Sequence, residues 1–364
     1  MNELKQKEKM LRDYMETNGY EGVMLFRRDT FSWLTCGRIN HIIRWTEFGM
    51  MALLITADKV YCVANQVEQH RMMEEELAGY DFELISVNWW EEDYIECVRR
   101  RFGAIRLAAD KDAPGVRNIY EDLQKMRFSL FPEEIERYRE VSLICTNAVE
   151  ETCRELKPGD TEHEVCASMI AKIMRQGFEA PVALVASDER IFRFRHPIDT
   201  DKKIGKYAMV VLCGRKYGLI ANLTRFVHFG EPPAEIVRKF ELVRKMNAEI
   251  ITNTVVGRSL ADLFKVIVGE YEKAGYKDEW KLLHQGGPAG YATRDFLITP
   301  DCPEYVHNNQ AFTWNPSITG TKSEDTILVN RDGFEVLTDS HNWPMVDIRT
   351  ENGATVSQPD LLIR

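Results

Sequence analysis

The sequence predicts a two-domain chain of mixed α/β (α+β) class, and three observations support this. At 364 residues the chain is about twice the length of a common domain. Short apolar runs alternate with longer segments of helical periodicity, as in strands and helices packed in layers. A composition of 44% hydrophobic and 29% charged residues is that of an ordinary globular protein and excludes disordered or fibrous chains.

The first predicted domain covers residues 1–130. A helix is expected at Leu4–Asn18, and Gly19 follows it as a stop signal. Four apolar runs come next, separated by polar helical segments, which predicts a mixed sheet with helices around it. These runs are Gly22–Phe26, Met50–Ile55, Val60–Ala64 and Ile105–Ala109.

The second predicted domain covers residues 131–364. Pro132 suits the first turn of a long helix that is expected to end near Leu156. Thr161 with Glu164 has the pattern of a capping box that begins the next helix. Strands are then expected at Pro181–Ala186, Ala208–Leu212 and Leu219–Val227, helices at Pro233–Val255 and Leu260–Gly275, and strands at Ala311–Trp314, Thr326–Val329 and Phe334–Leu337. Two helices followed by strands, repeated once, is the order that a duplicated α/β half gives.

Charge and cysteine usage argue against several kinds of partner. The 57 acidic residues outnumber the 47 Lys and Arg, for a net charge of −10, so we expect no nucleic-acid partner and no docking on anionic lipid. The eight cysteines form no CxxC pair, which favours buried thiols in a reducing compartment. No signal-peptide pattern opens the chain and no apolar stretch is long enough to span a bilayer. We therefore predict a cytoplasmic protein with no membrane partner.

Five segments in a fixed order carry a resemblance to a known superfamily. They are Phe131–Glu136, Leu156–Glu162, Ala221–Arg225, Leu283–Gly287 and Ser323–Val329. The set resembles the landmarks of the pita-bread superfamily, which includes methionine aminopeptidase, proline dipeptidase, aminopeptidase P and creatinase. The resemblance implies a creatinase-like N-terminal α/β domain at 1–130 and a C-terminal pita-bread domain at 131–364.

The resemblance also identifies the positions of a metal site. The superfamily's metallopeptidases bind two divalent ions through two Asp, one His and two Glu side chains. Here Asn222 stands at the second Asp and Asn315 at the first Glu, whereas His284 and Glu324 keep the His and the last Glu. The first Asp falls at position 211 or 212, where the residues are Val and Leu.

Only one of the four expected carboxylates therefore remains. Two amides, one imidazole and one carboxylate do not balance a charge of about +4, because hard divalent ions need anionic oxygen ligands. We therefore predict a site without metal and a protein without a cofactor. The alternative is a shifted alignment in which Asp295 or Asp325 replaces a lost ligand.

The predicted catalytic residues are His196, His284 and Glu324. Creatinase works without metal, and a histidine handles the proton during C–N hydrolysis there. His196 stands at the position similar to that histidine, and an imidazole with a pKa of about 6.5 moves protons at neutral pH. The alternative role for His196 is packing against a turn. A buried Glu324 without metal needs a partner, namely Arg225, His284 or a cationic group of the substrate.

Four further residues near the predicted catalytic positions are expected to bind substrate. Tyr291 and Arg294 lie in a segment similar to a Tyr-x-x-Arg-type segment of creatinase. The planar guanidinium of Arg294 suits a substrate carboxylate, although a salt bridge to Asp295 is the alternative. Asn222 and Asn315 are expected to offer hydrogen bonds where carboxylates bind metal in the metallopeptidases.

Arg44 and Trp45 are the predicted substrate-site residues from the first domain. In the superfamily, this domain often lends residues to the pocket of the partner subunit. The resemblance therefore implies a homodimer in which Arg44 and Trp45 close the partner's site. The alternative is an ordinary exposed arginine and a half-buried tryptophan.

Together these inferences predict a metal-independent hydrolase of a C–N bond in a small amino-acid-like or amidine substrate. Creatine itself is not favoured, because no second Glu lies near Thr224 to bind its guanidinium group. Two alternatives remain. One is an Xaa-Pro dipeptidase or aminopeptidase with an atypical metal site, and the other is a non-catalytic pseudo-peptidase that binds a ligand.

Overall fold

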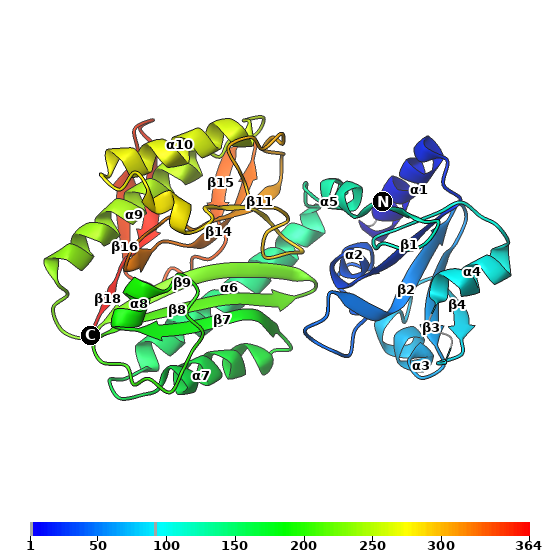
Figure 1. Cartoon of the computed structure of the whole chain (residues 1–364), viewed down its shortest axis with the longest axis horizontal. Helices are drawn as coiled ribbons and strands as arrows, with labels where there is room; N and C mark the ends of the chain where they lie inside the picture. The colour runs from blue at the N-terminus through cyan, green and yellow to red at the C-terminus, as the bar shows by residue number, and fades with distance from the viewer. Residues whose placement is uncertain (1–2, 91–92) are drawn as a thin grey trace. The chain divides into compact units, whose positions relative to one another are not determined.

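The computed structural model of the chain describes residues 3–90 and 93–364 and divides into two compact units (Figure 1). The first unit ends at Arg127 and the second begins at Phe128, close to the boundary expected from the sequence. Among the described residues, no helix is both long and apolar enough to cross a membrane. All eight cysteines are free thiols, and every one except Cys36 is buried.

The first unit is built on a six-stranded mixed sheet with the strand order β4-β3-β2-β1-β5-β6. The strands β1, β2 and β3 are antiparallel neighbours, whereas β4, β5 and β6 join in parallel. The strands are β1 (Gly22–Arg27), β2 (Phe48–Thr56), β3 (Val60–Asn65), β4 (Glu83–Val87), β5 (Leu107–Ala109) and β6 (Arg117–Asn118). The helices are α1 (Glu3–Asn18), α2 (Arg28–Leu34), α3 (Gln69–Arg71) with the π-helical turn η1 (Met72–Glu76), α4 (Tyr94–Phe102) and α5 (Tyr120–Met126).

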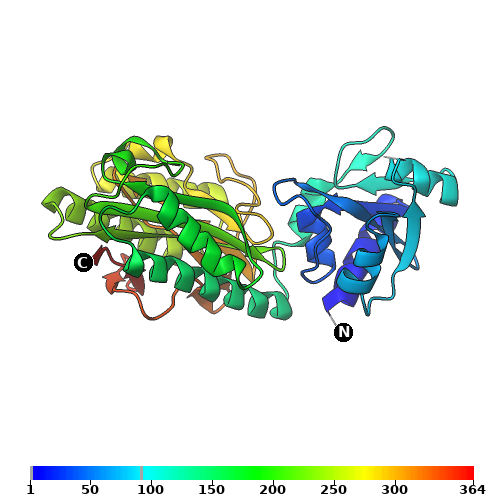
Figure 2. The same cartoon turned by 90° about the horizontal axis from the view of Figure 1, so that it is seen from below.

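The second unit contains two similar halves, each with a pair of helices and a four-stranded sheet. The first half has α6 (Pro132–Glu155), α7 (Glu162–Met174), β7 (Glu179–Ser187), α8 (Glu189–Arg193), β8 (Tyr207–Lys216) and β9 (Leu219–His228), and its sheet order is β18-β9-β8-β7. The helices α6 and α7 lie side by side over one face of this sheet (Figures 1 and 2).

The second half repeats this order. It has α9 (Ala234–Asn253), α10 (Leu260–Lys273), the 3-10 turn η2 (Glu279–Leu282), β10 (Gly286–Ala289), β11 (Gln310–Trp314), β14 (Asp325–Asn330) and β15 (Gly333–Val336), with the sheet order β10-β11-β14-β15. Two small hairpins and an edge strand complete the unit: β12 (Ser317–Ile318) with β13 (Thr321–Lys322), β16 (Met345–Arg349) with β17 (Thr355–Pro359), and β18 (Leu362–Ile363).

The two sheets of the second unit meet where β9 passes β14. The hydroxyl of Thr326 on β14 accepts a hydrogen bond from the Asn222 backbone N–H at 3.0 Å and donates one to the Asn222 carbonyl at 2.9 Å. The backbone N–H of Thr224 donates to the Glu324 carbonyl at 3.2 Å. These bonds satisfy buried backbone groups that lie outside either sheet's own ladder, so they fix the alignment of β9 with β14.

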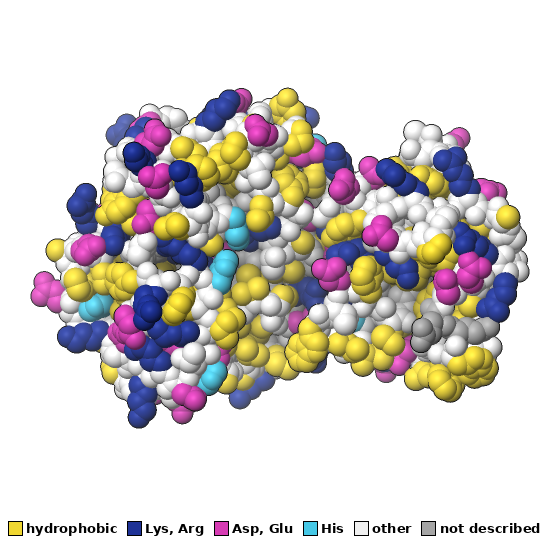
Figure 3. Space-filling model, in the orientation of Figure 1, with side chains coloured by type: hydrophobic (Ala, Val, Ile, Leu, Met, Phe, Trp, Pro, Cys, Tyr) yellow, Lys and Arg dark blue, Asp and Glu magenta, His cyan; other side chains and the backbone are white. Residues whose placement is uncertain are grey.

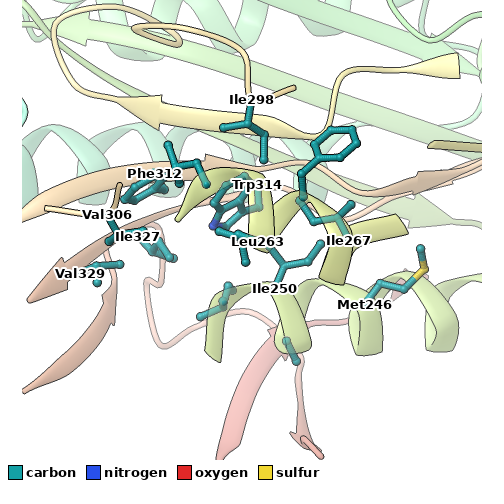
Figure 4. Packing of buried hydrophobic residues seen from close by; sticks show 14 of the residues in the cluster. Met246, Ile250, Leu263, Ile267, Ile298, Val306, Phe312, Trp314, Ile327 and Val329 are labelled. Atoms are coloured by element: carbon teal, nitrogen blue, oxygen red, sulfur yellow. The ribbon is translucent and has the colours of Figure 1, made fainter. Parts of the chain in front are cut away.

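The larger core of the second unit lies between the pair α9 and α10 and the sheet that contains β11 and β14 (Figure 4). Trp314, Phe312 and Ile327 pack from the strands against Leu263, Ile267 and Ile250 from the helices. This apolar layer holds one side of β11 in place, and β11 ends directly before Asn315.

The helix-start signals in the sequence are confirmed. Pro132 is the first residue of α6, and the Glu134 side chain accepts from the backbone N–H of Phe131 at 2.8 Å. The hydroxyl of Thr161 accepts from the Glu164 N–H at 3.1 Å, which is the expected capping box of α7. The mixed sheet of the first unit and the repeated order of two helices and a sheet in the second unit, both expected from the sequence, are present.

We predict that Leu263→Ala lowers the free energy of unfolding by about 2–5 kcal/mol, because Leu263 is fully buried in this core and its loss leaves a cavity. Equilibrium unfolding in urea measures the change. Leu282→Ala is the matched control, because that leucine is 57% exposed and its loss should change the free energy by less than about 0.5 kcal/mol. Equal effects of the two substitutions would contradict this description of the core.

Candidate active site

The strand β9 presents Asn222 and Thr224 on one face, because side chains two residues apart in a strand point the same way. In the antiparallel ladder, Cys213 lies opposite Asn222 and Val211 opposite Thr224. Opposed residues share a face, so Val211 rather than its neighbour on β8 takes the place of the first expected Asp. An apolar side chain therefore stands where an anionic ligand is needed.

Glu324 lies between β13 and β14 and is almost completely buried. Its carboxylate accepts hydrogen bonds from the Thr224 hydroxyl at 2.6 Å and the Lys322 ammonium at 2.8 Å on one oxygen, and from the Arg294 guanidinium at 3.1 Å on the other. Burial opposes ionisation, but the charges of Lys322 and Arg294 outweigh it and lower the pKa of Glu324 to about 2. The carboxylate is therefore ionised and both of its oxygens are bound.

Lys322 was not singled out from the sequence. A usable signal was present, because a residue two positions before Glu324 in extended chain lies on the same side. Arg225 was one of the possible partners of Glu324 expected from the sequence, and this alternative is wrong. Arg225 is buried behind this group, where it pairs with Asp325 at 3.0 Å and donates to the Thr338 carbonyl at 2.8 Å.

Arg294 links Glu324 to the position of the first expected Glu. Its guanidinium also donates to the amide oxygen of Asn315 at 3.2 Å. The amide nitrogen of Asn315 in turn donates to the backbone carbonyl of His284 at 3.0 Å. These bonds link His284, Arg294, Asn315 and Glu324, and the Thr293 carbonyl accepts from both Arg294 at 2.5 Å and Asn222 at 3.5 Å. The substrate and catalytic roles expected for these residues stay predictions.

His196 and His284 lie next to each other, with ring centroids 6.0 Å apart. Burial and the nearby charge of Arg294 lower the pKa of His284 to about 4. Burial and the charge of Lys322 also lower the pKa of His196 from its ordinary value, although this side chain is exposed after α8. Both rings are therefore neutral at pH 7, and each carries one nitrogen that accepts a proton.

Three buried polar atoms in this group have no hydrogen-bond partner among the described residues. They are Oδ1 of Asn222, Nδ1 of His284 and Nε of Arg294. The nitrogen of the Asn222 amide is bound, because it donates to the Thr313 hydroxyl at 3.1 Å. Buried polar atoms in folded proteins normally have partners. The amide oxygen of Asn222, the ring nitrogen of His284 and the guanidinium nitrogen of Arg294 are therefore available to a polar ligand.

Tyr291 has a structural contact that the sequence did not indicate. Its side chain is buried, and its hydroxyl donates to Glu134 near the start of α6 at 2.5 Å. This bond ties the loop after β10, which carries Arg294, to α6. The substrate contact predicted for Tyr291 stays a prediction.

Arg44 and Trp45 belong to the first unit, in the segment before β2. Both are exposed, and Trp45 is 90% accessible to solvent. The segment is held by Arg28, whose guanidinium donates to the carbonyls of Arg44 and Thr46. The alternative of a half-buried tryptophan is therefore wrong for Trp45, and the predicted contact with a partner's pocket stays a prediction.

The donor set does not fit a pair of divalent ions. The one carboxylate of the group already binds two side-chain cations, and the amides of Asn222 and Asn315 carry no charge. No cluster of three or more His, Cys, Asp and Glu with metal-binding geometry exists in residues 3–90 and 93–364. Asp325 is paired with Arg225, which argues against its use as a replacement ligand. Lys322 and Arg294 thus supply the positive charge beside Glu324.

Comparison with known proteins identifies the family. The sequence profile of metallopeptidase family M24 matches residues 136–331, and that of the creatinase/prolidase N-terminal domain matches residues 8–141. The chain belongs to the M24 metallopeptidase family. It is therefore a hydrolase of the peptidase type, as the sequence analysis predicted.

Relatives within M24 are distant. An uncharacterised peptidase of Staphylococcus haemolyticus is 25% identical over 320 residues, which cover 79% of this chain and 88% of the relative. An Xaa-Pro dipeptidase of Pyrococcus furiosus is 25% identical over 244 residues, 61% of this chain and 66% of the relative. The prolidase of Pyrococcus horikoshii superposes with a TM-score of 0.78 at 17% identity, over 92% of this chain and 98% of that one, which confirms the pita-bread fold.

We predict that His284 makes this M24 protein less stable as the pH falls from about 6.5 to about 4. In that window the unfolded chain binds a proton on this imidazole while the folded chain, with its lowered pKa, does not. His284→Asn should therefore show a shallower loss of unfolding free energy between pH 6.5 and pH 4, measured by urea denaturation.

His163→Asn is the control, because its effect on the pH dependence of the unfolding free energy should have the opposite sign. The hydrogen bond to Asp199 raises the pKa of His163, so this side chain contributes stability at low pH that is lost as the pH rises. A pH profile that His284→Asn leaves unchanged would contradict the assigned environment of His284.

Proposed function

We propose that this M24 protein is a metal-independent hydrolase that cleaves a C–N bond in a small amino-acid-like or amidine substrate. One observation carries the proposal: Glu324 is bound by Lys322 and Arg294, and the remaining positions of the family's metal site are neutral. A buried carboxylate that is already neutralised has little affinity for a further cation. The reaction therefore depends on side chains alone.

The proton transfers are assigned to His196. Its neutral imidazole takes a proton from a water molecule while the water oxygen bonds to the substrate carbon. The same proton then passes from His196 to the leaving nitrogen as the C–N bond breaks, which balances the hydrolysis. His284 is less suited to be the acid, because its pKa of about 4 keeps it unprotonated at neutral pH. Its free nitrogen instead accepts from the water or from the substrate.

Substrate orientation is assigned to the unpaired polar atoms. The buried Oδ1 of Asn222 accepts an N–H group, and Nε of Arg294 donates to an oxygen of the substrate. Such a pair suits a molecule with an amide or amidine next to a carboxylate. Dipeptides, which the related Xaa-Pro dipeptidase cleaves, have both groups, and so do N-carbamoyl and amidino derivatives of amino acids.

We predict that His196→Ala lowers kcat about 10²–10⁴-fold, the typical contribution of a positioned general base. Turnover of a panel of Xaa-Pro dipeptides, N-acyl amino acids and amidino acids measures it. His163→Ala is the matched control in the same unit, since that exposed histidine pairs with Asp199 and should leave kcat unchanged.

The same preparation decides the role of metal. Activity should survive exhaustive treatment with a chelator, and elemental analysis should find less than one transition-metal ion per chain. An activity that a chelator abolishes and Mn²⁺ restores contradicts the proposal and favours an Xaa-Pro peptidase with an atypical metal site. Absence of turnover of the whole panel contradicts it as well and favours a ligand-binding pseudo-peptidase.

We also propose that the protein is a homodimer and that Arg44 and Trp45 act in the partner's site. Hydrophobic side chains gather along the lower edge of the first unit in Figure 3. Large apolar residues of this unit that are more than 45% exposed are Ile42, Ile43, Trp45, Val67, Trp89 and Trp90. So many exposed large apolar side chains in one unit favour a protein surface as their partner.

We also propose a cytoplasmic location, because the free thiols agree with a reducing compartment.

We predict that Trp45→Ser raises the dissociation constant of the dimer about tenfold or more, because exposed tryptophans are common energetic centres of interfaces. Analytical ultracentrifugation over a concentration series measures it. Val255→Ser, at a residue of the second unit that is 48% exposed, is the control and should not change the association. A monomeric wild-type chain at the highest concentration would disprove the dimer.

A further inference from the structure

Lys322 is a buried cation whose bonding capacity is largely unused. Its side chain is 8% exposed, and its ammonium carries three donors. One of these binds Glu324 at 2.8 Å. The ammonium is close enough to His196, His284 and Cys213 to shift the pKa of each of them. Lys322 therefore lies among the groups assigned to the reaction.

The charges of this group do not balance. Lys322 and Arg294 together carry +2, and the ionised Glu324 carries −1, so one positive charge remains. His284 is neutral at pH 7 because its pKa is about 4, and burial raises the pKa of the Cys213 thiol to about 12. Neither residue supplies the missing negative charge.

Other buried or half-buried arginines around the group are each matched with a carboxylate. Arg225 pairs with Asp325 and with Glu150 behind β9. Arg195 binds Glu279, and Arg244 binds Asp360. Lys322 and Arg294, by contrast, share the carboxylate of Glu324, and a buried charge without its own counter-ion is costly. This cost is removed if the ligand of the site is an anion.

We propose that Lys322 binds an anionic oxygen of the ligand, so that the site selects a molecule that carries one negative charge at the reacting end. This inference rests on the proposed hydrolase function and adds the charge of the substrate to it. Two sources supply such an oxygen. One is a planar carboxylate of the bound substrate, and the other is the tetrahedral oxyanion that forms when water adds to its carbonyl group.

The two sources place different demands on Lys322. If it binds the substrate carboxylate, its contribution is already present in the ground state and appears in KM. If it binds the oxyanion, its contribution appears only in the transition state and therefore in kcat. A lysine can serve either source, because its ammonium presents point-like charge and rotatable donors rather than a fixed fork.

The test measures anion binding directly, with or without turnover. Wild-type protein is titrated at constant ionic strength with acetate, a planar anion, with methylphosphonate, a tetrahedral anion, and with acetamide, a neutral analogue of acetate. Calorimetry or amide chemical shifts in the isotope-labelled chain give the dissociation constants. We expect binding of at least one anion and at least tenfold weaker binding of acetamide.

Three substitutions assign the bound anion to Lys322. Lys322→Met should weaken anion binding tenfold or more, because a charge-assisted hydrogen bond is lost. Glu324→Gln should strengthen anion binding, because the positive charges of Lys322 and Arg294 are then no longer offset by a carboxylate. Lys239→Met is the matched control: this lysine is buried to the same extent and paired with Glu235 at 2.8 Å outside the group, so its loss should change nothing. If Lys322→Met does not fold, Lys322→Gln replaces it in the same comparison.

The relative affinities for the two anions identify the oxygen that Lys322 binds. Preference for acetate assigns Lys322 to a substrate carboxylate, and preference for methylphosphonate assigns it to the oxyanion. Equal affinity of wild-type protein and Lys322→Met, or equal affinity for acetate and acetamide, overturns the inference. Anion binding at Lys322 without any hydrolysis in the panel described above supports this inference while contradicting the proposed hydrolase, so the two failures are distinguishable.

Discussion

The pairing of one carboxylate with two side-chain cations is the central interaction of the candidate site in the second unit. Glu324 is buried and ionised, and it stays so because Lys322 and Arg294 donate to its two oxygens. Without them the carboxylate would either take up a proton or require a metal ion as its counter-charge. The neutral amides at Asn222 and Asn315 suit this arrangement, because further carboxylates would compete for the same two cations.

The position of this group follows from the meeting of the two sheets. Thr326 fastens β14 to β9 through the backbone of Asn222, and the hydroxyl of Thr224 reaches Glu324 across the same junction. Each half of the second unit therefore supplies part of the group: β9 contributes the amide and the hydroxyl, and the segment around β13 and β14 contributes the ion pair. Packing of α9 and α10 on β11 keeps Asn315 within reach of Arg294.

Much of this organisation was readable from the sequence. The capping signals at Pro132 and Thr161 gave correct helix starts, because such signals depend on a few adjacent residues. The lost metal ligands were visible through their positions in ordered motifs. The strand β10 was not foreseen, since Gly286 and Gly287 are poor strand formers. Their place in the ladder is set by tertiary contacts, because a Cβ at Gly286 would meet the Thr313 carbonyl at 2.1 Å. The role of Lys322 was also missed, because a single lysine carries no motif; its position two residues before Glu324 was the one usable signal.

The bond between Lys322 and Glu324 also constrains which substitutions the site can accept during evolution. An aspartate introduced at Asn222 alone would add a negative charge next to Glu324, whose charge Lys322 and Arg294 already offset. It would not by itself restore enough ligands for a metal ion. Removing Lys322 alone would take away a partner of Glu324 without restoring any ligand. Restoring the family's metal-ligand residues therefore needs several coordinated substitutions, each unfavourable when it occurs singly. Epistasis of this kind makes the substitutions at those positions hard to reverse.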